Sequence, residues 1–310
     1  MWFVALAVVL GLALVGAVVA LIVTERRNRP PKPVAPAPAV VGRESLDVID
    51  AGLKRLTGEC VRSGRSLPDL YAVVYSEERL GLLLAGAEKD APRPWTAEED
   101  GERWSTPPKA LERRGMDEQA LPYALTVTVG LGGPDRVLVD LSRAAATISV
   151  AGPDEEVRSF ARAVITEVVT GPVGGSGEVT LVGSLATDTR LNGNGMFPSG
   201  LHTAADLEEG FARTAGARDT QAPEAADVTQ VFRLIEGHSQ ASVPGESPQL
   251  FVIEATQLPR RKEALAGLRR GDALLVLGEA PAGWRWRAGE DGSLDTGPLG
   301  LDINKHAGRM

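Results

Sequence analysis

The stretch from residue 147 to residue 170 constrains the fold of this chain more than any other part. A short β-branched run over 147–151 meets Gly152, and after a few residues a second apolar segment begins. The apolar side chains of that segment recur at helical spacing, which predicts a helix over 155–170: Val157, Phe160, Ala161, Val164, Val168. A strand, a glycine and a helix in this order are the setting in which phosphate-binding loops occur.

The loop has the spacing of such a motif without its chemistry. The pattern G-x-x-x-x-G-K-[ST] fits from Gly152 to Ser159, but Val157 stands in place of the second glycine and Arg158 in place of the lysine. Residues 154–156 add three carboxylates at the helix N-terminus, where they favour the helix dipole and repel a phosphate. We expect a degenerate P-loop with no catalytic residue and no bound cofactor.

A second motif position is also incomplete. The run from Leu250 to Ala255 has the apolar character of a Walker B strand, and Glu254 is its single acid where an acidic pair is usual. Weak nucleotide binding therefore stays open as an alternative, and we expect no hydrolysis.

Strands and helices alternate over the second half of the chain. Buried apolar strands predicted at 147–151, 179–183, 250–254 and 273–277 alternate with helices predicted at 155–170, 204–215, 225–236 and 259–270. This alternation predicts an α/β fold, a mainly parallel sheet with flanking helices, within a degenerate P-loop-like domain over 123–303.

Before it, residues 44–122 predict a small α+β hairpin region. It combines a helix over 44–64, with Cys60 on its apolar face, and a hairpin over 70–85. A further hairpin is predicted over 124–141, within the larger domain, and another over 284–303. Four tryptophans lie near loops or in the last hairpin. They predict either rings that pack over the hairpins or a surface that binds a partner: Trp95, Trp104, Trp284, Trp286.

The N-terminal segment predicts one transmembrane helix over 1–24. Residues 2–23 are almost continuously apolar and would extend for roughly 33 Å as a helix, enough for one crossing. A cleavable signal peptide normally has basic residues before its apolar core, whereas here the basic cluster follows it. The positive-inside rule then places the N-terminus outside the cell membrane and the main domain in the cytoplasm. Residues 25–43 form a basic, proline-rich linker, and 304–310 a short tail.

Charge and composition exclude several classes of function. The net charge of the whole chain is −8, and because residues 24–43 are net basic by four charges, residues 44–310 carry −12. A domain with this negative charge repels phosphate backbones, so we expect no binding of nucleic acid. The single cysteine and three scattered histidines give no metal-binding spacing, so we expect no metal.

The order of these motifs resembles the start of an FtsK/EccC-type motor domain. The resemblance lies in Val137-Leu138-Val139-Asp140-Leu141, Ile148-Ser149-Val150-Ala151-Gly152 and the strands at 250–255 and 273–277. A further resemblance, over about 65–303, is to a cytoplasmic region of actinobacterial membrane proteins that carry LysM and transcriptional-activator (BTAD) modules. It is carried by Arg65 to Val73, Pro94-Trp95-Thr96, Pro122-Tyr123 and the segment 284–301. The second resemblance implies a regulatory or scaffold role and supplies no catalytic residues.

We therefore expect a membrane-anchored, non-enzymatic interaction, scaffold or regulatory module on a pseudo-ATPase core, with one or more protein partners. The alternatives are a weak nucleotide-binding protein and a component of a secretion or translocation motor. Hydrolysis through Gly237-His238-Ser239-Gln240-Ala241, which imitates a nucleophile elbow, is disfavoured because the following proline-containing segment cannot continue a helix.

Overall fold

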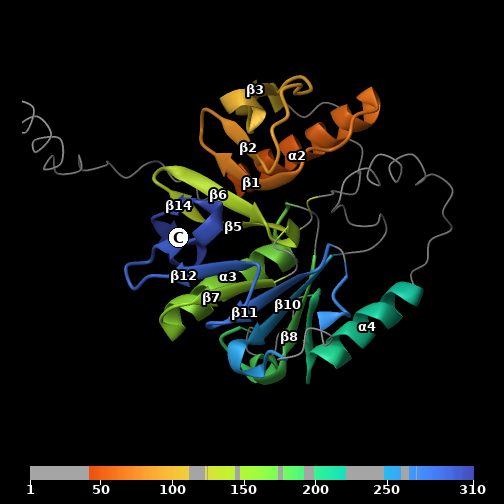
Figure 1. Cartoon of the computed structure of the whole chain (residues 1–310), viewed down its shortest axis with the longest axis vertical. Helices are drawn as coiled ribbons and strands as arrows, with labels where there is room; N and C mark the ends of the chain where they lie inside the picture. Colours follow the sequence, from red (N-terminus) through yellow and green to blue (C-terminus); the bar gives the residue numbers. More distant parts are fainter. Residues whose placement is uncertain are drawn as a thin grey trace, which may run out of the picture. The chain divides into compact units, whose positions relative to one another are not determined.

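Three α-helices and two sheets form alternating layers in the part of the chain that the structure describes (Figure 1). The computed structural model describes residues 42–111, 123, 125–143, 147–173, 177–191, 199–220, 248–259, 265–269 and 271–310. Helix α2 covers one face of an antiparallel sheet, α3 lies between that sheet and a mixed sheet, and α4 covers the far face of the mixed sheet. The helix bounds are Arg43–Ser63 for α2, Asp154–Thr170 for α3 and Leu207–Thr220 for α4.

The antiparallel sheet has seven strands in the order β15-β5-β6-β1-β2-β4-β3. The hairpins predicted over 70–85 and 124–141 belong to it, and they join where β1 pairs with β6, with Val74 opposite Val137. Its strands are β1 Leu70–Tyr75, β2 Leu80–Leu84, β3 Thr96–Glu98, β4 Arg103–Thr106, β5 Thr126–Gly132, β6 Asp135–Asp140 and β15 Lys305–His306.

The mixed sheet has eight strands in the order β14-β13-β12-β7-β11-β10-β8-β9. The six strands from β12 to β9 run parallel to their neighbours, and β13 and β14 add an antiparallel edge. Its strands are β7 Thr147–Ala151, β8 Glu178–Val182, β9 Leu201–Ala204, β10 Gln249–Glu254, β11 Ala273–Leu277, β12 Trp284–Ala288, β13 Leu294–Asp295 and β14 Asp302–Ile303.

Helix α3 is the central element because it buries side chains toward both sheets. Phe160 and Val164 are essentially inaccessible to solvent, and they share one core with Val139 of the antiparallel sheet and with Val150 and Leu275 of the mixed sheet. The ring of Phe160 also meets the edge of Trp286, with 6.1 Å between ring centroids. The predicted helix over 155–170 is thus confirmed, and its two-sided burial gives the two sheets a common core.

Helix α2 packs on the outer face of the antiparallel sheet, as its apolar spacing predicts. Cys60 is buried there, which confirms its predicted place on the apolar face of the helix, and burial raises the pKa of its thiol to about 11. Trp95 and Trp104 belong to the same core, where Trp104 donates from its indole nitrogen to the Glu88 carbonyl at 2.6 Å.

Two expectations about the architecture need correction. The region 123–303 does not form one mainly parallel sheet: its first hairpin, β5 and β6, pairs with β1 in the antiparallel sheet, and its last strands form an antiparallel edge. Residues 304–310, predicted as a short tail, include β15, which pairs with β5 in the antiparallel sheet. Alternating hydrophobicity identifies a strand, but it does not identify the neighbour that the strand pairs with, and this explains both differences.

Several predicted segments lie outside the described residues. These are the apolar run 2–23, the linker up to residue 41, the helix over 225–236, the elbow-like stretch 237–241 and part of the helix over 259–270. Within the described ranges, no helix has the length and apolar character needed to cross a membrane.

A buried carboxyl closes the second hairpin. Asp140 is the last residue of β6, is only 2 % exposed, and accepts hydrogen bonds from the backbone nitrogen and hydroxyl of Ser142 at 3.1 and 2.7 Å. Burial raises the pKa of Asp140 to about 6, because the hydrogen bonds from Ser142 cancel only part of the increase that desolvation causes.

This raised pKa predicts that ionisation of Asp140 lowers the free energy of unfolding as pH rises, an effect that an Asp140→Asn variant lacks. The folded state holds the Asp140 proton more tightly than the unfolded chain, so this residue's contribution to stability falls as pH rises from about 4 to about 6. We expect the free energy of unfolding of Asp140→Asn, relative to the native protein, to rise over that interval by up to about 3 kcal/mol and then to stay level. Urea denaturation at several pH values measures it.

An Asp47→Asn variant on α2 controls for the change in net charge. The same difference at every pH between Asp140→Asn and the native protein would contradict the prediction.

Candidate functional site

The segment 147–170 forms the predicted strand, turn and helix. β7 ends at Ala151, Gly152 has a φ of +144°, and α3 begins at Asp154. A Cβ atom on Gly152 would lie 2.4 Å from the carbonyl oxygen of Ala288 in β12. Glycine is therefore needed here because the backbone of β12 approaches closely, whereas in a working P-loop glycine allows the close approach of a phosphate.

Arg158 forms ion pairs with three carboxylates at this edge of the mixed sheet. Its Nε donates to both oxygens of Asp154 at 2.9 and 3.0 Å, Nη1 to Asp188 at 2.5 Å and Nη2 to Glu254 at 2.6 Å. Burial alone would lower the pKa of Arg158, but the bonds to Asp154 and Glu254 outweigh it and raise the pKa. All three nitrogens of the guanidinium are thus engaged, and we call these four residues the Arg158 cluster.

The topology of the sheet explains why these side chains meet. Glu254 is the last residue of β10, Asp188 follows the short helix after β8, and Asp154 opens the helix after β7. Strands β7, β11, β10 and β8 are parallel neighbours, so their carboxyl ends lie at one edge. Arg158 reaches from the first turns of α3 past the end of β11 to β10.

A second arginine extends the cluster toward solvent. Arg190 lies 3.8 Å from Asp154, 3.6 Å from Glu155 and 3.5 Å from Asp188, and its side chain is 48 % exposed. Such exposed pairs add little energy each. They do show that the acids of the loop are matched by arginines of this chain.

The third acid of the loop, Glu156, is held by the C-terminal residues. It is 5 % exposed, and it accepts hydrogen bonds from Nε2 of His306 at 2.9 Å and from Nε of Arg309 at 2.8 Å. The bonds from Arg309, and then that from His306, lower the pKa of Glu156 to about 2. Gly308 donates its backbone N–H to Nδ1 of His306, which places the imidazole proton on Nε2, facing Glu156.

The two remaining motif positions are also occupied. Val157 points into the core between the sheets and is 4 % exposed, so its side chain is needed for packing. Ser159 donates its hydroxyl to the carbonyl of Gly308 at 2.8 Å. In a working P-loop this hydroxyl would bind Mg²⁺.

The structure therefore brings Arg158 and Glu254, the two predicted motif positions, into direct contact. Gly152 and Ser159 flank the cluster without entering it, and Val157 turns away from it. The sequence analysis missed Asp188 and the tail residues that hold Glu156. Asp188 follows a predicted parallel strand, which was a usable signal, but a one-turn helix separates the two.

The chemistry of this site is unfavourable to a nucleotide. A phosphate could bind Arg158 only by competing with carboxylates that already engage all three of its guanidinium nitrogens, and it would be repelled by their charge. Within the described residues, no group of three or more histidine, cysteine or acidic side chains could hold a metal ion.

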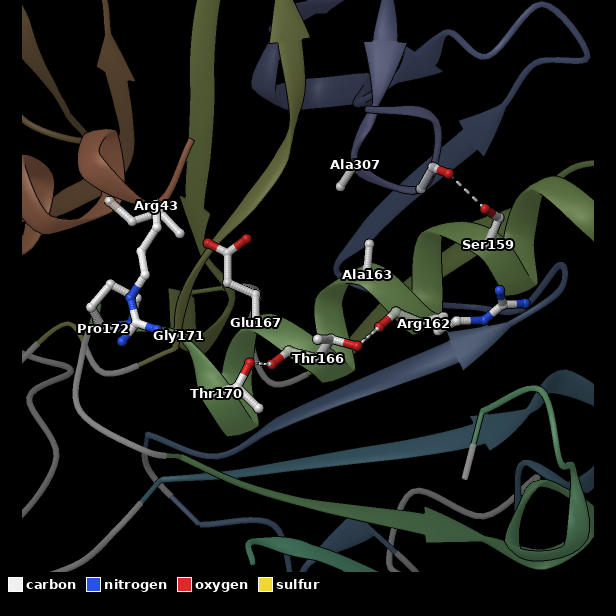
Figure 2. A pocket seen from close by; sticks show the side chains of 12 residues that line it. Arg43, Ser159, Arg162, Ala163, Thr166, Glu167, Thr170, Gly171, Pro172 and Ala307 are labelled. Carbon is white, nitrogen blue, oxygen red and sulfur yellow. Dashed lines mark hydrogen bonds between the residues drawn. The ribbon is translucent and has the colours of Figure 1, made fainter. Parts of the chain in front are cut away.

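A cavity of about 450 Å³ runs along the outer face of α3, between the start of α2 and the C-terminal turn (Figure 2). Its polar lining is largely satisfied within the chain. The hydroxyls of Thr166 and Thr170 donate to helix carbonyls, and Glu167 accepts from the backbone and hydroxyl of Thr128. Arg43 extends beside Gly171 at one end of the cavity.

The four tryptophans within the described residues, at 95, 104, 284 and 286, form no exposed patch. Trp95, Trp104 and Trp286 are 4 %, 2 % and 2 % exposed, and a partner cannot contact them in this structure. Trp284 is partly exposed and stacks on Trp286 with the ring planes 16° apart. Of the two predicted roles, packing is the one observed for Trp95, Trp104 and Trp286, because large aromatic rings gain most by filling the cores beneath the loops.

The Arg158 cluster makes a prediction about stability. Arg158→Ala leaves three carboxylates facing one another, and we expect the free energy of unfolding to fall by about 2–3 kcal/mol. Arg162→Ala removes an exposed arginine one turn along the same helix, whose Nε donates only to the carbonyl of Arg190 at 2.8 Å; as the control, it should change the free energy of unfolding by less than about 1 kcal/mol. Chemical denaturation of both variants provides the measurement.

Adding Glu254→Gln to Arg158→Ala should recover part of the loss, because one uncompensated carboxylate is removed. Equal stability of the Arg158→Ala and Arg162→Ala variants would show that the cluster is not a structural element.

Of the comparisons with known proteins, only the one with solved structures found similar proteins. No protein-family model matches the chain, so the resemblance to LysM/BTAD-type membrane proteins stays a prediction. No curated protein matches its sequence either.

Two similar structures are of EccC from Thermomonospora curvata. One is EccC (ATPases 2 and 3) in complex with a signal sequence peptide, at 12 % identity and TM-score 0.33, covering 59 % of this chain and 36 % of that chain. The other is the cytoplasmic domain of the type VII secretion ATPase EccC, also at 12 % identity and TM-score 0.33. This match covers 71 % of this chain and 32 % of that chain. A third, described as an ATPase, has 13 % identity and TM-score 0.31, covering 63 % of this chain and 84 % of its own. The chain thus spans about a third of the length of the first two structures, and similarity at this level carries no conclusion about its function.

Proposed function

We propose that this chain is a non-hydrolysing interaction module built on a degenerate P-loop-like core. The observation that carries the proposal is the Arg158 cluster, in which the residue at the lysine position binds the glutamate at the Walker B position at 2.6 Å. In this proposal the arginine takes over a structural task of a bound nucleotide, because it joins the loop after β7 to the carboxyl ends of β8 and β10.

The C-terminal residues support the same proposal. Glu156 and Ser159, which point out from the first turns of α3, are bound by His306, Gly308 and Arg309. A helix N-terminus that would receive phosphate in an active enzyme is engaged here by the protein's own tail. The core would then stay in one conformation and present its surfaces to partners, without a nucleotide cycle.

We expect ATP with Mg²⁺ to leave the thermal unfolding of the full chain unchanged. A ligand at a concentration 100 times its Kd would add about 2.7 kcal/mol of stability, which a thermal shift detects easily. Phosphate release, measured in parallel, should stay at the level of buffer alone. A P-loop ATPase with an intact motif is the positive control for both assays.

The proposal fails if ATP raises the melting temperature in a saturable manner and Arg158→Ala abolishes the rise while Arg162→Ala retains it. That outcome would establish the weak nucleotide-binding alternative instead.

We also propose that residues 2–23 span the cell membrane once, with the main domain on the cytoplasmic side. The apolar length and the basic cluster after it support this proposal. Protease treatment of intact and of opened cells should digest the main domain only after opening. An active alkaline phosphatase fused to residue 310 would place the domain outside and refute this orientation.

The motor-component alternative is favoured by one observation, that the Walker A-like and Walker B-like positions meet at a single site. It requires an active ATPase as a partner, whereas the scaffold proposal does not. Crosslinking in native membranes distinguishes the two by whether an ATPase is recovered with this chain.

A further inference from the structure

The antiparallel sheet has an inner face that α3 covers only in part. Ala72, Val139 and Val127 of this face belong to the core around α3. Toward β2 and β4, the face instead borders a cavity of about 370 Å³, closed on one side by residues 299–302 before and at the start of β14. This size lies within the range of ligand pockets.

The floor of this cavity is apolar and accessible. Tyr71 and Val74 of β1 and Leu299 and Leu301 of the closing loop are only partly buried, and they pack against the main core. In an antiparallel sheet, one face is normally apolar and packs against the core, and the other face is polar and lies in solvent. Partly exposed apolar side chains on the second face mark a place where another apolar group can pack.

The rim of the cavity is acidic. Four carboxylates and one arginine line it, and that arginine, Arg103, already donates to Glu99 at 2.8 Å. Among the described residues, the carboxylates of Glu102, Asp135 and Asp302 receive no hydrogen bond and form no ion pair. The free charge around the apolar floor is therefore negative, which excludes anionic ligands and favours a cation.

We propose that this cavity, between β1, β2 and residues 299–302, binds a segment of a protein partner in which lysine or arginine lies beside an aliphatic residue. The alkyl stem and the neighbouring aliphatic side chain would pack on Tyr71, Val74 and Leu301, and the cationic group would lie among Glu102, Asp135 and Asp302. The inference rests on the proposed interaction function, for which it supplies a docking surface and the chemistry of the partner.

The test measures binding of an amidated pentapeptide of alternating leucine and arginine to the full chain by calorimetry. The variant E102Q/D135N/D302N, which removes the three free charges, should weaken binding about tenfold or more. The matched control D47N/E208Q/E290Q makes the same change in net charge at three positions outside the cavity, and it should bind as the native protein does.

Two altered peptides separate charge from packing. Replacing arginine by citrulline tests the rim, replacing leucine by glycine tests the floor, and each should weaken binding. Because the three carboxylates have no partner within the described residues, their neutralisation should not lower the melting temperature, which verifies that the variant is folded.

No binding of the pentapeptide to the native protein, or an equal loss in the cavity variant and its control, would overturn the proposal. Either result leaves the Arg158 cluster and the nucleotide experiment unaffected, so failure of this inference is distinguishable from failure of the proposed function.

Discussion

The burial of α3 between two sheets is the constraint on which the rest of the structure depends. Phe160 and Val164 are in contact with the core of both sheets, so neither sheet has a complete core without this helix. Removing such a side chain typically costs about 3–5 kcal/mol for phenylalanine, a large share of the stability of an ordinary domain. The position of α3 therefore fixes the position of its N-terminus, and with it the degenerate loop.

Once α3 is fixed, the charges at its N-terminus must be satisfied where they lie. Arg158 meets Asp154, Asp188 and Glu254, while Glu156 meets His306 and Arg309, which come from the other end of the domain. Ion pairs such as those of Arg158 and Arg309 are weak evidence of net stabilisation, but removing one partner is costly because it leaves a charge uncompensated. The C-terminal residues thus have a specific task, and β15 ties them to the antiparallel sheet at the same time.

The two sides of the antiparallel sheet differ for a related reason. The core that α2 shares with the outer face includes residues of β1, β2, β4 and β6, whereas α3 covers only part of the inner face. The remaining part is bordered by acidic side chains and an accessible apolar floor. This part of the inner face borders a cavity because the two sheets share a single helix, α3, which does not extend over the whole inner face of the antiparallel sheet.

The sequence by itself determined the elements and showed that the phosphate-loop pattern is incomplete. Periodicity gave α2, α3, both hairpins and the strands around Val150, Val252 and Leu275, because each element must match its own apolar spacing to a buried face. The presence of Arg158 at the lysine position of the motif, and of Val157 at its second glycine position, was visible without a structure. Only the tertiary structure decided that the hairpin at 126–140 joins the first sheet, that Asp188 and Glu254 share Arg158, and that the tail binds Glu156. These outcomes depend on contacts between residues 30 to 150 positions apart, and local patterns carry no information about which distant partner a strand edge or a charge will meet.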